Sequence, residues 1–92
     1  MEFMGVNIVV GGYYYVETSS GAKSIFVHSD CMYDGVTSYR YRVHLVGHCG
    51  LPVFRLATNC VICADSCVTK IRPCNENERA MLDWYIRKSL SE

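Results

Sequence analysis

Alternation of apolar and polar side chains predicts a strand-rich body over residues 1–72. The clearest strand runs from residue 39 to residue 46, where tyrosine and aliphatic residues alternate with cationic ones. Because successive strand residues point to opposite faces, one face would carry Tyr39, Tyr41, Val43 and Leu45, and the other Arg40, Arg42 and His44. Shorter β-prone runs predict further strands at residues 6–10, 13–17, 24–28 and 53–57.

Glycine pairs and small polar residues separate these runs. Gly11-Gly12 lies between two β-prone segments and predicts a two-residue hairpin turn, because such a turn needs positive φ at both central positions. The segment CVICADSCVTKI, residues 60–71, fits either two strands joined by a tight loop at residues 64–66 or one helical turn. Its β-branched residues favour strand or loop.

The pattern changes to a helical period after Pro73. Asn75, followed three residues later by Glu78, forms a capping-box signature. It predicts a helix over about residues 76–90. Its apolar stripe consists of Met81, Leu82, Tyr85, Ile86 and Leu90.

These elements predict one small α+β domain over residues 1–92. We expect an antiparallel sheet of about four to six strands with one C-terminal helix packed on it. The length of 92 residues allows only a modest core, so stability should depend on a few well-packed contacts.

The net charge of the whole chain indicates no particular partner. Nine basic and nine acidic residues cancel, so composition predicts neither a nucleic acid nor an anionic membrane as partner. No apolar run reaches the length of a membrane span. The start, MEFMGVNIVVGG, lacks the basic region of a signal peptide. We therefore expect a complete cytoplasmic protein.

Six cysteines are the most prominent chemical feature of the sequence. In a reducing compartment, thiols of this kind bind metal, react, or pack as small apolar side chains. The Cys60-x2-Cys63 pair and nearby Cys67 could supply three ligands to a structural zinc, with Cys49 as the fourth. His48 and Cys74 are alternatives for the fourth position. A single Cys-x2-Cys pair is an incomplete zinc pattern, so packed thiols without a cofactor are the preferred interpretation.

The cationic strand face is the best candidate for partner binding. Arginine forks suit carboxylates and phosphates, and tyrosine and arginine are common interface anchors. The predicted surface consists of Arg40, Arg42, His44, Arg55 and Tyr14. No phosphate loop, paired carboxylates or Ser/His/Asp arrangement is present in the sequence, and no catalytic residue is predicted.

We expect a small non-enzymatic cytoplasmic protein that docks onto a larger protein or ribonucleoprotein. A phage or viral inhibitor of host defence, of the anti-CRISPR kind, is the concrete form of this hypothesis, and it rests on size and the absence of catalytic motifs. One alternative is a zinc-stabilised nucleic-acid-binding module. Another is a secreted effector stapled by disulfides.

Overall fold

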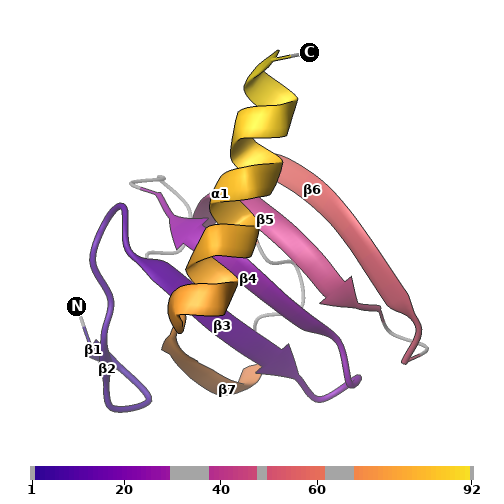
Figure 1. The fold of residues 1–92 in the computed structure, drawn as a ribbon. Helices are drawn as coiled ribbons and strands as arrows, with labels where there is room; N and C mark the ends of the chain where they lie inside the picture. The colour runs from indigo at the N-terminus through magenta and orange to yellow at the C-terminus, as the bar shows by residue number, and fades with distance from the viewer. Residues whose placement is uncertain (1, 30–37, 48–49, 62–67, 92) are drawn as a thin grey trace.

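The structure is a computed structural model that describes residues 2–29, 38–47, 50–61 and 68–91, with the backbone alone for residues 60 and 61. Its elements in chain order are β1 (Glu2–Phe3), β2 (Val6–Asn7), β3 (Tyr13–Thr18), β4 (Lys23–His28), β5 (Ser38–Val46), β6 (Pro52–Val61), β7 (Val68–Pro73) and α1 (Glu76–Ser91). Five strands form an antiparallel sheet in the order β6-β5-β4-β3-β7, and α1 crosses one face of it (Figure 1). The predicted α+β fold is confirmed.

Apolar side chains fill both faces of this sheet. On the helix side, Leu82 of α1 is fully buried against a cluster that includes Tyr15, Ile25, Val27 and Val43. On the other side, the N-terminal segment covers a second cluster of Ile8, Tyr14, Val16, Phe26, Tyr39 and Ile71. Burial on two faces explains why the segments YYYV and SIFV read as continuous apolar runs and not as alternating ones.

The helix begins with the predicted capping box. The Glu78 N–H donates to Asn75 Oδ1 at 2.8 Å, and the Asn75 N–H donates to Glu78 Oε1 at 3.0 Å. These two bonds satisfy first-turn amides that have no partner within the helix. Of the predicted apolar stripe, Leu82, Tyr85 and Ile86 pack on the sheet. Met81 and Leu90 are exposed.

A charged brace joins the last strand to the helix. The Arg72 guanidinium donates two hydrogen bonds to the Glu78 carboxylate, at 2.7 and 2.8 Å. The same guanidinium also lies over Tyr15, whose ring centroid is 4.1 Å from the guanidinium carbon. The two hydrogen bonds hold the pKa of Glu78 below its ordinary value. Glu78 therefore both caps α1 and connects it to β7.

The predicted hairpin at Gly11-Gly12 is wrong, because the segments before and after this turn do not pair with each other. The chain does turn there, because the Gly12 N–H donates to the Val9 carbonyl at 3.0 Å and Gly11 has a φ of 82°. However, β2 pairs with β1, and β3 pairs with β4 and β7. The two ends of residues 60–71 lie in strands, β6 and β7, which are at opposite edges of the sheet and do not pair. The predicted loop at residues 64–66 lies outside the described residues.

Replacing Gly12 with alanine should lower the free energy of unfolding by about 1–3 kcal/mol, the range typical of overpacking. A Cβ at this position would lie 2.5 Å from the Tyr14 hydroxyl oxygen. That hydroxyl accepts from the Val9 N–H at 2.9 Å and donates to the Asn7 carbonyl at 3.2 Å, so the ring is held in place. Urea denaturation measures the effect. A loss of less than about 0.5 kcal/mol, the range of substitutions without a packing conflict, would contradict this argument.

Candidate protein-binding site

An irregularity in β5 divides the predicted row of cations. Tyr41 pairs with Val27, and Tyr39 pairs with the next residue, His28, so Arg40 is an extra residue on β5. Such a bulge changes which face the neighbouring side chains occupy. Tyr39 packs in the cluster away from the helix, whereas Tyr41 packs on the helix side. The expectation that Tyr39 shares a face with Tyr41 is therefore wrong.

Arg42 lies inside the protein and not on a solvated face. It is 8% exposed, its Nε donates to Ser24 Oγ at 2.9 Å, and its guanidinium carbon lies 5.5 Å from the Tyr39 ring centroid. The prediction of Arg42 as an accessible binding residue fails on this burial. A side chain with these contacts supports the fold.

The remaining predicted binding residues are scattered. His44 and Arg55 are cross-strand neighbours on β5 and β6, with His44 half-buried and Arg55 exposed. Tyr14 is 4% exposed beneath the N-terminal segment, so the expectation that its side chain is accessible is wrong, as it is for Arg42. Arg40 is exposed and lies apart from these residues, on the helix side of the sheet.

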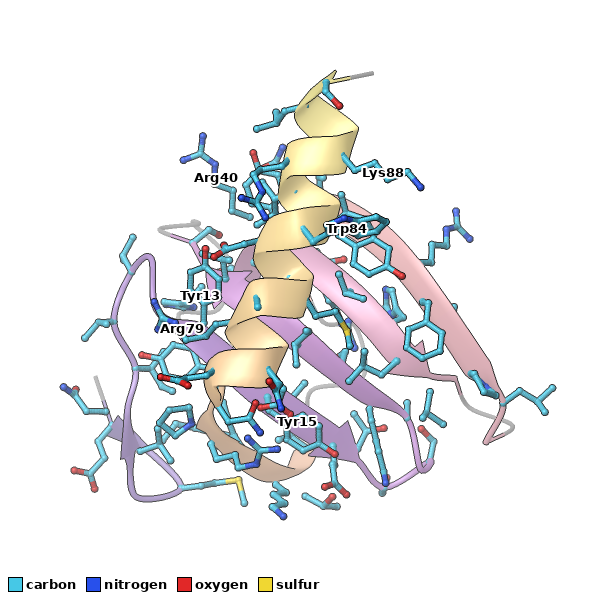
Figure 2. The ribbon with its side chains drawn as sticks, in the orientation of Figure 1. Tyr13, Tyr15, Arg40, Arg79, Trp84 and Lys88 are labelled. Atoms are coloured by element: carbon cyan, nitrogen blue, oxygen red, sulfur yellow. The ribbon has the colours of Figure 1, made fainter. Side chains whose placement is uncertain are left out.

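Arg40 borders a shallow depression between α1 and the sheet, which we call the arginine depression. Its volume is about 410 Å³. Arg40 and Tyr41 of β5 line it together with Arg87 of α1 and Tyr13 of β3. Figure 2 shows Arg40 and Tyr13 on the same side of the helix. The complete lining consists of Gly11, Tyr13, Val27, Arg40, Tyr41, Asp83, Ile86 and Arg87.

The charges around this depression are mostly positive. The Tyr13 hydroxyl donates a hydrogen bond to Asp83 Oδ1, and this bond, followed by burial, raises the pKa of Tyr13. Arg79 lies over the Tyr13 ring, 4.6 Å from its centroid, and Arg40 lies 5.8 Å from the centroid of Tyr41. Within the described ranges, no carboxylate forms an ion pair with Arg40, Arg79 or Arg87. Arg40 and Arg87 thus line the depression and Arg79 lies over its Tyr13, whereas the one carboxylate in the lining, Asp83, is already hydrogen-bonded.

This arrangement suits recognition of an anion. Arginine presents planar, paired donors that match carboxylate oxygens, and the tyrosine rings beside it supply apolar contact area. A shallow depression of this kind fits a side chain of a macromolecule better than an enclosed small molecule, because ligand pockets usually bury most of their ligand.

The predicted zinc ligands lie outside the described residues or have no described side chain. Cys49, Cys63 and Cys67 belong to the first group and Cys60 to the second. Among the residues that the structure does describe, no three histidine, cysteine or acidic side chains gather as metal ligands. The zinc hypothesis stays a prediction.

Cys74 is the one cysteine whose side chain is described, and it packs in the cluster beneath the helix. Burial raises the pKa of its thiol to about 12. A thiol with so high a pKa is protonated at neutral pH and is a poor nucleophile. Cys74 therefore behaves as a small apolar side chain, in agreement with the packed-thiol interpretation at this position.

Three residues of this site, Arg79, Asp83 and Arg87, were not predicted from the sequence. They are spaced four residues apart, so they form one stripe along the helix. That spacing was a usable signal. What the sequence did not indicate was that this stripe would face Tyr13 and Arg40, because the contact joins α1 to β3 and to the bulge in β5.

Comparison of the chain with protein-family models, with curated proteins and with solved structures finds no match. In the described part of the chain, no helix has the length and apolar character needed to cross a membrane.

Proposed function

We propose that the protein is a non-enzymatic binding protein that docks onto a larger protein or ribonucleoprotein through the arginine depression. The depression would receive an acidic segment of that partner. The observation that supports this most strongly is the convergence of Arg40 and Arg87 beside Tyr13 and Tyr41, with no ion pair to either arginine in the described residues.

An acidic protein segment suits this surface better than nucleic acid. The net charge is zero, and the positive charge at the depression comes from three arginines with Asp83 among them. Nucleic-acid surfaces usually extend a basic field along many phosphates. A local arginine cluster on two tyrosines instead resembles the anchors of a protein interface.

Inhibition is the form of action that this proposal favours. A 92-residue chain that covers an acidic surface on a larger assembly can block access to that surface without any chemistry of its own. The anti-defence function of a phage or viral product in the host cytoplasm remains a specific hypothesis of this type. It is supported by the small size of the chain and by the absence of catalytic motifs in its sequence.

The proposal can be tested with a fluorescein-labelled octaglutamate peptide and fluorescence anisotropy. Arg40→Glu combined with Arg87→Glu should weaken binding roughly tenfold or more, because exposed ion pairs contribute about 0.2–1 kcal/mol each and reversal adds repulsion. Both positions are exposed, so the urea midpoint should stay nearly constant.

Arg55→Glu is the matched control, because it makes the same charge change at an exposed position on β6, away from the depression. It should leave octaglutamate binding almost unchanged. Equal weakening by the control would show a general charge effect and would contradict the proposed site. Tighter binding of an eight-nucleotide oligothymidine than of octaglutamate would contradict the choice of a protein partner.

A further inference from the structure

In the part of the chain that the structure describes, β6 is an edge strand of the sheet. It pairs with β5 on one side, and in the described chain no strand lies on its other side. The opposite edge, β7, lies against β2. Free edges expose backbone N–H and C=O groups that can pair with another extended chain.

Two residues in left-handed conformation set the limits of this edge. Phe54 has a φ of 49° and Asn59 a φ of 50°. Between them, residues 55–58 pair without interruption with residues 41–44 of β5. Irregularities of this kind prevent a long edge from pairing indiscriminately. The regular portion is therefore suited to a short segment.

A groove runs beside this short edge, between β6 and α1. It has a volume of about 380 Å³, and Leu56, Thr58, Tyr85, Lys88 and Ser89 line it. Trp84 meets the Tyr85 ring edge-on at 5.0 Å and remains 50% exposed. The Lys88 ammonium lies 5.0 Å from the Trp84 ring centroid (Figure 2). Leu56 and Tyr85 thus supply apolar surface to the groove beside the polar Thr58 and Ser89, and Lys88 supplies one cation.

The charges at this edge identify the kind of occupant. Arg55 and Lys88 are the charged residues of β6 and of the groove lining, and no acidic residue occurs in either set among the described residues. A second copy of this chain would bring the same β6, which has no carboxylate to offer these cations. The complementary partner is a foreign segment that carries both apolar and acidic side chains.

We propose that an extended segment of a partner protein pairs with residues 55–58 as an additional strand. One apolar side chain of that segment enters the groove over Leu56 and Tyr85, and a carboxylate two residues away, on the same face, reaches Lys88. This is recognition by strand addition, in which backbone hydrogen bonds give affinity and alternate side chains give specificity. The site lies on the opposite side of α1 from the arginine depression, so either site can fail without the other (Figure 2).

The test uses a displayed library of random seven-residue peptides, panned against the full chain with Arg40→Glu and Arg87→Glu, which remove the cations of the arginine depression. Affinity measurements on the selected peptides follow, in the same background. We expect selected sequences to have an apolar residue followed two positions later by aspartate or glutamate. Lys88→Glu should weaken their binding roughly tenfold or more, because it replaces an ion pair by repulsion. Two further peptides carry a backbone N-methyl group, one at the apolar residue and the other at its neighbour. Only one of these two amides faces β6, so one of the two peptides should lose binding and the other should keep it.

Lys23→Glu is the matched control, since it makes the same change at an exposed position on β4 that lines neither the groove nor the arginine depression. It should leave the selected peptides bound. Replacing the peptide carboxylate by lysine should restore binding to the Lys88→Glu variant. Failure to select any peptide, selected peptides that Lys23→Glu weakens as much as Lys88→Glu does, or a dimer that forms through β6 and excludes them would each overturn the proposal.

Discussion

Leu82→Ala should lower the free energy of unfolding by about 2–5 kcal/mol, which is a large fraction of the stability expected for a small domain. Leu82 of α1 has no exposed surface, and it packs against the strands that carry Ile25 and Val43. Truncation to alanine removes apolar contacts on both elements and leaves a cavity that a rigid sheet cannot close. Urea denaturation followed by circular dichroism measures the loss.

Leu90→Ala is the control for this substitution. Leu90 belongs to the same predicted apolar stripe, but it is 70% exposed near the end of the helix. Its truncation should change the free energy of unfolding by less than about 0.5 kcal/mol. Similar losses at Leu82 and Leu90 would mean that the helix does not pack on the sheet through the face described above.

Glu78→Gln should cost about 1.5–3 kcal/mol, the range for hydrogen bonds to charged groups. The carboxylate accepts two hydrogen bonds from Arg72 and one from the Asn75 N–H, so a neutral amide cannot satisfy all three donors. Glu76→Gln is the control. Glu76 lies in the same first helical turn and is exposed, so the loss there should be smaller.

The same brace predicts a dependence of stability on pH. Because the pKa of Glu78 is lower in the folded state than in the unfolded state, its contribution is complete above the unfolded pKa of about 4.3. The contribution is lost as the pH falls through the folded pKa. The difference in urea midpoint between the wild type and Glu78→Gln should therefore shrink below about pH 4. A constant difference down to about pH 2 would show that the charge of Glu78 is not what holds α1 to β7.

The helix and the central strands could be predicted from sequence because their signals are local. The capping box needs only Asn75 and Glu78, which lie three positions apart. The sequences of β4 and β5 are β-prone runs as long as ordinary strands. Strand partners were less predictable. Gly11-Gly12 does turn the chain, but β3 pairs with β4 and with β7, and the residues of β7 lie fifty or more positions further along the chain than their partners in β3.

The binding surface was predicted only in part, because its geometry depends on a bulge and on a second apolar layer. Simple alternation places Arg40 and Arg42 together, and only the pairing with β4 shows that Arg40 is an extra residue. Tyr14 looked available at the surface because the sequence does not indicate that the N-terminal segment covers it. Arg87 joins Arg40 through the packing of α1 on the sheet, which no local pattern specifies.

The most direct test of the proposed function is a titration of the isotope-labelled protein with octaglutamate, observed through its backbone amide resonances. We expect the largest shifts to fall on Arg40, Tyr41, Asp83 and Arg87, around the arginine depression, and to disappear in the Arg40→Glu and Arg87→Glu double variant. Largest shifts at His44 and Arg55, or shifts that persist unchanged in the double variant, would contradict the proposed function.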